Sequence, residues 1–198
     1  MKTVTVGQFK NFGPCWLETA EGRGKFARIA AIRNEWTALD VLNLPDVSAQ
    51  DKLWSVLREE FIEVPTLHEF SCRCAEYALS FVASPDPRSI AAIEAKRKWL
   101  RGEITDAELH AAWDEARYAA QYAAWDFAWD AACAATTAAA QDAAWDVAWS
   151  AARVAALAAA RVAALAATMD ATMDDAWDAT MDAAREHEVE ILRELLEE

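Results

Sequence analysis

The residues in this sequence with the clearest capacity for chemistry are His68, Cys72 and Cys74, because imidazole and thiolate groups bind zinc. His68 and Cys72 are four residues apart and lie on one face of a helix. Cys74 lies about 200° round the helix from Cys72, so Cys15 or Cys133 would have to complete the site. A structural zinc site normally has four closely placed ligands. We therefore predict reduced thiols packed among apolar side chains, with no metal and no other cofactor.

The sequence offers no recognisable catalytic arrangement. The three histidines have no serine or aspartate at a spacing typical of a nucleophile and its base. Gly22-Arg23-Gly24 does not match a phosphate-binding loop and is predicted to form a turn between helices. The basic side chains nearby could contact phosphate or an acidic partner, but a solvated helix face or pairing with the acidic half is preferred. These basic residues are Arg23, Lys25, Arg28 and Arg33. We predict that the protein is not an enzyme.

A four-residue repeat occupies residues 168–182, where Met or Trp is followed by Asp and the intervening residues are mostly Ala or Thr. Positions four apart lie on one helix face and advance about 40° per repeat, so an apolar stripe carries an acidic edge. Like charges at this spacing cost a few tenths of a kcal/mol per pair, and no basic residue lies between Arg161 and Arg185. The candidate partner-binding residues are Asp170, Asp174, Asp175, Asp178, Asp182, Met173 and Trp177.

Two interpretations of this acidic edge remain open. It is either a solvated face or a binding face for a basic protein. Five charges over about 18 Å is roughly half the charge density of double-stranded DNA, so the edge is not predicted to imitate a duplex.

Tryptophan is the second candidate for ligand binding. Because Ala-rich helices bury little surface, we favour core packing for these side chains, each worth about 2–3 kcal/mol. The alternative is that they stack on a nucleotide-like signal in a cleft between helices, with an arginine binding its polar atoms. The residues of this alternative site are Trp113, Trp125, Trp129, Trp145, Trp149 and Arg153.

Charge is divided unequally along the 198 residues. The formal net charge is +1 over residues 1–102 and −15 over residues 103–198, which together give −14. Such a chain should repel nucleic acid and anionic membranes and attract basic partners. No apolar run is long enough to span a membrane, and "MKTVTVGQFK" does not resemble a secretory signal, so a cytoplasmic protein is expected.

Helix-capping motifs predict where the helices that carry these candidate residues begin and end. Capping-box spacing predicts helix starts at Thr66 and Thr105 and, more weakly, at Ser48. Asp86-Pro87 predicts another start and Gly102 a helix end. We find no alternating pattern typical of strands, so strands are not expected.

The 96 residues after Gly102 contain no Pro or Gly and 35 Ala. One helix of that length would leave its Trp and Leu side chains in water, so two or three antiparallel helices are predicted. Thr136-Thr137 and the region of Thr168 are the expected turns. The predicted fold is all-α: short N-terminal helices over residues 1–101 pack on a bundle of long Ala/Trp-rich helices over 102–198, and the two parts are expected to form one compact unit.

The motifs "LHEFSCRCAEYALSF", "PDPRSIAAIEAKRKWLRGEITDAEL" and "REHEVEILRELLEE", with the Ala/Trp/Asp array between them, resemble the Imm-5-like immunity proteins of bacteria and prophages. Many members of that family alternate Arg with Asp in the array, whereas this chain has only Arg117, Arg153, Arg161 and Arg185 there before the final helix. The resemblance implies protein antagonism in a bacterial cytoplasm, or in the host cytoplasm if the gene is carried by a phage. It transfers no catalytic residue.

The expected function is therefore that of a non-enzymatic interaction protein. It would bind and neutralise a basic effector, such as a toxin or a defence protein, through its acidic surface. The alternative is a binder that sequesters a nucleotide-like signal. A homo-oligomer is also possible, whereas nucleic acid and membrane are not expected partners.

Overall fold

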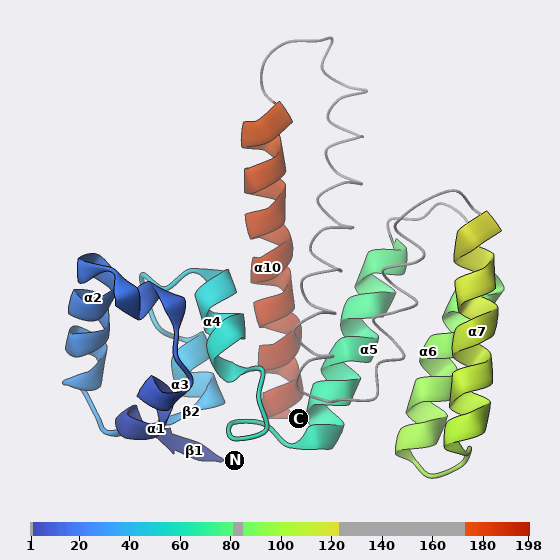
Figure 1. Ribbon diagram of the computed structural model, residues 1–198, viewed down its shortest axis with the longest axis horizontal. Coiled ribbons are helices and arrows are strands. Elements are labelled where there is room, and N and C mark those ends of the chain that lie inside the picture. The colour runs from blue at the N-terminus through green and yellow to red at the C-terminus, as the bar shows by residue number, and fades with distance from the viewer. Residues whose placement is uncertain (1, 81–84, 123–172) are drawn as a thin grey trace.

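The computed structural model describes residues 2–80, 85–122 and 173–198, and 72% of these residues lie in α-helices (Figure 1). A mostly helical chain is therefore confirmed. The short elements are β1 (Thr3–Thr5), α1 (Val6–Asn11), the 3₁₀-helix η1 (Cys15–Glu18), α2 (Ala20–Ala30), β2 (Glu35–Thr37), α3 (Ala38–Leu42) and α4 (Ala49–Val56). The long elements are α5 (Val64–Ser80), α6 (Pro87–Leu100), α7 (Asp106–Tyr122) and α10 (Met173–Glu197).

The expectation that the chain forms no strands is wrong. β1 and β2 form a two-stranded antiparallel sheet in which Val4 lies opposite Trp36, and both side chains are buried. Each strand ends at a threonine that caps the next helix. Thr5 and Thr37 accept the amide hydrogen of the third helical residue at 3.2 and 3.1 Å. Three residues are too few to display alternation, so the sequence pattern could not reveal these strands.

Other predicted helix boundaries are confirmed. Ser48 caps α4 through its hydroxyl, and Asp86 caps α6 with Pro87 at the first helical position. Thr105 and the glutamate three residues later form the predicted capping box at the start of α7. Gly102 follows α6 with φ of 70°, a left-handed conformation that glycine adopts without strain.

The predicted start of α5 at Thr66 is wrong, because the helix begins at Val64. Pro65 therefore lies inside the first turn. A proline is tolerated there because the first amide groups of a helix have no intrahelical acceptor.

The predicted turn at residues 22–24 is also wrong, because these residues lie within α2. Thr19 starts this helix, and its Oγ1 accepts a hydrogen bond from the amide of Gly22 at 3.0 Å. A strong N-cap thus outweighs the low helix propensity of two glycines.

Helix α10 occupies the centre of the molecule, between α4 and α5 (Figure 1). It packs on α3, α4 and α5; α5 packs on α6, and α6 packs on α7 as an antiparallel pair. The boundary expected between residues 101 and 102 falls in the turn between α6 and α7. Because α10 packs against α3 to α5, elements from both sides of that boundary share one core.

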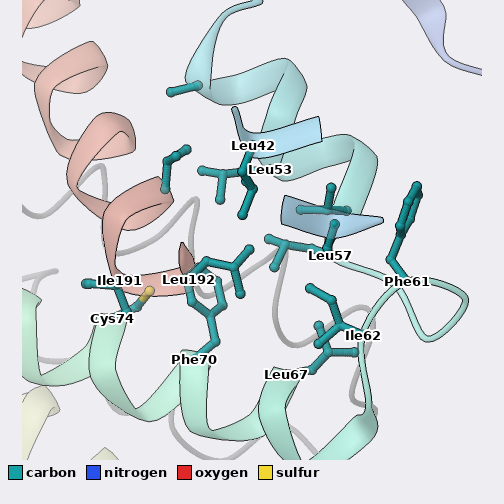
Figure 2. Close-up of a cluster of buried hydrophobic side chains, with 14 of the residues drawn as sticks. Leu42, Leu53, Leu57, Phe61, Ile62, Leu67, Phe70, Cys74, Ile191 and Leu192 are labelled. Atoms are coloured by element: carbon teal, nitrogen blue, oxygen red, sulfur yellow. The ribbon is translucent and has the colours of Figure 1, made fainter. Parts of the chain in front are cut away.

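The core is built where α3, α4, α5 and α10 meet. Figure 2 shows Phe70 and Cys74 of α5 directed toward α10, with Leu42 and Leu53 approaching from the other side. These side chains and Leu192 of α10 are at most 2% exposed. Burial of one such side chain stabilises the fold by about 1.5–3 kcal/mol, so α10 is held mainly by apolar contacts.

None of the helices in the described part of the chain has both the length and the apolar composition that a membrane span requires. The turns expected at Thr136-Thr137 and near Thr168 lie outside the described residues. So does residue range 123–172, which holds most of the expected bundle of long helices.

Candidate functional site

Helix α10 has one buried side, which is largely apolar but also carries Glu188, and one exposed acidic side. Met181, Val189 and Leu192 are 5%, 1% and 0% exposed, and they face the core. Asp182, which follows Met181, is exposed. Both side chains of this Met-Asp pair are described. The methionine is buried in the apolar stripe and the aspartate is exposed at its edge, as the repeat predicts.

The acidic side continues past the repeat that predicted it. Four exposed carboxylates follow one another at four-residue intervals along the C-terminal part of α10. We call this set the acidic row: Asp182, Glu186, Glu190 and Glu194. Four residues advance a helix by about 6 Å, so the row extends over about 18 Å. Because the opposite side of α10 is packed in the core, the carboxylates are presented on a rigid support.

Two members of the acidic row have cationic neighbours on their own helix. Arg185 Nη1 lies 3.4 Å from an Asp182 carboxylate oxygen, and Arg193 forms an ion pair with Glu190. Arg193 also donates through Nε to Asn43 Oδ1 of the turn after α3, at 3.2 Å. Among the described residues, Glu186 and Glu194 have no ion-pair partner, so these two carboxylates are the most available to an external cation.

The other predicted partner-binding residues are described less fully. Met173, Asp174, Asp175, Trp177 and Asp178 all belong to α10, so they share one continuous helix with the acidic row, but their side chains lie outside the described residues. Asp170 lies outside the described residues altogether.

The alternative tryptophan site is mostly undescribed. Trp125, Trp129, Trp145, Trp149 and Arg153 lie outside the described residues. Trp113 belongs to α7, is half-buried, and makes an edge-to-face contact with His110 at a centroid distance of 5.2 Å.

Of the residues that could suggest zinc, the structure describes the side chains of His68, Cys72 and Cys74, whereas those of Cys15 and Cys133 lie outside the described part. Cys72 and Cys74 are fully buried and reduced, as predicted. Across the part of the chain that the structure describes, no group of three or more His, Cys, Asp or Glu is placed to hold a metal ion. Burial raises the pKa of the Cys72 thiol to about 12, which makes it a poor nucleophile at neutral pH.

His68 belongs instead to a buried polar cluster between α5 and α6. Its ring makes an edge-to-face contact with Trp99 at 5.6 Å, and Lys96 Nζ lies 4.2 Å from the centroid of the Trp99 ring. His68 and Lys96 are 2% and 1% exposed. Burial and the nearby lysine lower the pKa of His68 to about 4, so it is neutral at pH 7. His68 and Lys96 are closed off from solvent while Trp99 is half-buried, and the cluster is best explained as packing between two helices.

Ion pairs strengthen the contact between α5 and α6. Arg97 of α6 donates through Nε and Nη2 to Glu69 of α5, with the shortest distance 2.8 Å, and its other contacts reach Glu76. These hydrogen bonds raise the pKa of Arg97 further above its ordinary range. Arg73 of α5 instead pairs with Glu198, the residue after α10, at 2.9 Å. Much of the positive charge on α5 and α6 is thus used within the fold.

The basic residues around residues 22–24 have separate roles. Arg23 Nη1 donates to the carbonyl oxygens of Leu17 and Glu18, and Arg33 pairs with Asp40 at 2.7 Å. Both are engaged within the fold. Arg28 is exposed, and Lys25 lines an apolar cavity. They do not form one phosphate-binding cluster.

Sequence reasoning stopped the acidic surface at Asp182 and missed Glu186, Glu190 and Glu194. The available signal was the four-residue step of the acidic residues itself, which continues although the preceding residue is no longer Met or Trp but Arg185, Val189 and Arg193. The cavity beside Lys25 was also missed, because its walls come from segments far apart in the chain.

Comparison of the chain with models of protein families, with curated proteins and with solved structures finds no match.

Proposed function

We propose that this protein is a non-enzymatic interaction protein that binds and neutralises a basic protein effector through the acidic row of α10. The observation that carries the proposal is the exposed, four-residue spacing of carboxylates on a helix whose other side is buried. A pre-organised row of charge binds a complementary surface with little loss of conformational freedom.

Repulsion among the carboxylates of the acidic row favours a binding surface over a merely solvated one. Repulsion between carboxylates four residues apart costs a few tenths of a kcal/mol per pair. Arg185 and Arg193 relieve that repulsion at Asp182 and Glu190, whereas Glu186 and Glu194 have no such relief among the described residues. A lysine or arginine from a partner would supply it.

The type of effector follows from the resemblance to Imm-5-like immunity proteins, which implies antagonism of a toxin or a defence protein in a bacterial cytoplasm. This part of the proposal stays a prediction. Sequestration of a nucleotide-like signal also stays a prediction, since five of its six proposed residues lie outside the described part of the chain.

The test combines capture and charge reversal. The protein is immobilised and exposed to a bacterial lysate at about 0.05 M salt, where surface electrostatics are weakly screened. Proteins released at about 0.5 M salt are identified, and the dissociation constant of the most enriched basic protein is measured by calorimetry. We expect E186K combined with E194K to weaken this binding by at least about tenfold.

Two further variants make the test specific. D182N combined with E190Q should weaken binding less, because the charges of those residues are already shared with Arg185 and Arg193. The control is E94K combined with E115K, which makes the same change in net charge on exposed positions of α6 and α7. Equal loss of affinity in the control and in the α10 charge-reversal variant would contradict a specific acidic-row site.

A further inference from the structure

A cavity of about 220 Å³ lies between α2 and the body formed by the sheet, α3 and α4. It is independent of the acidic row. Its walls are largely apolar and come from elements spread over residues 4–61. The main apolar wall residues are Val4, Phe9, Phe26, Ile29, Trp36 and Val41.

Several of these walls are well-packed parts of the fold. Val4 and Trp36 face each other across the sheet and are 2% and 7% exposed. Phe9 stacks on Phe26 of α2 at a centroid distance of 5.7 Å. The cavity is partly open to solvent, so a small ligand can enter it without unfolding of its walls. A preformed apolar cavity with a few polar groups at its edge is the general form of a small-molecule site.

Lys25, Glu21 and Asp51 all line the cavity, so its edge carries charges of both signs. Glu21 is exposed, and water screens its charge, whereas the other polar groups differ in whether they are already engaged. Ser55 Oγ donates to the Asp51 carbonyl at 2.6 Å, and the Asp51 carboxylate accepts from the Ser48 hydroxyl at 2.9 Å. Lys25 is half-buried and has neither a hydrogen bond nor an ion pair with any described residue. A cation beside an apolar cavity matches a carboxylate attached to an apolar body.

We infer that this cavity binds a small apolar monocarboxylate, with the apolar body between α2 and the sheet and the carboxylate at Lys25. Its size limits the ligand. A dry apolar cavity of about 150 Å³ accommodates benzene, so by proportion about 220 Å³ accommodates an apolar body of roughly nine heavy atoms. A phenyl ring with a three-carbon chain has that size.

The experiment uses three probes with the same ten-carbon phenylbutyl skeleton: 4-phenylbutyrate, 4-phenylbutanol and 4-phenylbutylamine. Binding to the full-length protein is measured by calorimetry and by ligand-induced increase in melting temperature. We expect 4-phenylbutyrate to bind at least about tenfold more tightly than the amine, with the alcohol between them. K25Q should reduce the affinity for the acid about five- to tenfold and leave that for the alcohol within about twofold.

A filling variant separates the cavity from non-specific binding. Ala30 lines the cavity, whereas Ala27 lies on the exposed side of the same helix. A30L should abolish binding of the acid and the alcohol, and A27L should preserve both, with circular dichroism confirming that each variant is folded. The inference is overturned if the folded wild-type protein does not bind 4-phenylbutyrate, if the amine binds as tightly as the acid, or if A30L binds like A27L.

Discussion

Helix α5 lies between α10 and α6, and its two sides are held by different forces. The side toward α10 is mainly apolar, with Phe70 and Cys74 packed near Leu192 (Figure 2). Its charged groups are the buried Glu188 of α10 and the pair of Arg73 with Glu198. The side toward α6 contains the buried His68 and the ion pairs of Arg97. Apolar burial is insensitive to salt and to moderate changes of pH, whereas charged contacts respond to both. The attachment of α10 and that of the α6–α7 pair should therefore fail under different conditions.

The largest effect is expected at the apolar contact. L192A should lower the free energy of unfolding by about 3–5 kcal/mol, because it removes a fully buried side chain and leaves a cavity. Urea unfolding followed by circular dichroism measures this change. E194A, two residues later on the exposed side, should change stability by less than about 0.5 kcal/mol. A loss below about 1 kcal/mol for L192A would mean that α10 does not complete the core.

The second effect is expected at His68 and depends on pH. Its pKa is about 4 in the fold, because of burial and Lys96, and about 6.5 in the unfolded chain. The unfolded chain therefore binds the proton more readily, and the free energy of unfolding should fall as pH drops from about 6.5 to 4, by at most about 3 kcal/mol.

H68L isolates this contribution from that of the carboxylates, which also titrate in acid. Nδ1 of His68 has no hydrogen-bond partner in the described structure, so the substitution removes no bond at that atom. Urea unfolding at several pH values should find the variant increasingly more stable than the wild type below about pH 6.5. Parallel curves for the two proteins would rule out a neutral, buried histidine.

The smallest effect is expected at the ion pairs. R97Q should cost about 1–2 kcal/mol at low salt, because Arg97 makes two-atom contacts with Glu69 in a half-buried position. R73Q, whose main partner Glu198 is 62% exposed, should cost less than about 0.5 kcal/mol. The difference between the two variants should shrink at about 0.5 M salt. Equal costs at low salt would remove the distinction between half-buried and exposed pairs.

Local rules predicted much of the helical structure. The caps at Ser48, Asp86 and Thr105 and the helix end at Gly102 depend on hydrogen bonds within a few residues, so their spacing is visible in the sequence. The sheet was not visible, because the pairing of Val4 with Trp36 depends on tertiary contact across about thirty residues.

The candidate sites divide in the same way. The exposure of Asp182 beside the buried Met181 follows from helical periodicity alone. The partners of Arg185 and Arg193, and hence the contrast between engaged and available carboxylates, follow from side-chain geometry that spacing does not specify. The cavity at Lys25 requires the packing of α2 on the sheet, which no local pattern encodes.

The position of α10 in the chain has a consequence for biosynthesis. The partners of Leu192 in α3, α4 and α5 leave the ribosome more than a hundred residues before it does. Until α10 has been synthesised, nascent chains would expose an apolar surface that includes Leu42, Leu53 and Phe70. Exposed apolar surface of this kind is bound by chaperones and attacked by proteases. The cellular yield of this protein should therefore depend on how quickly translation completes α10.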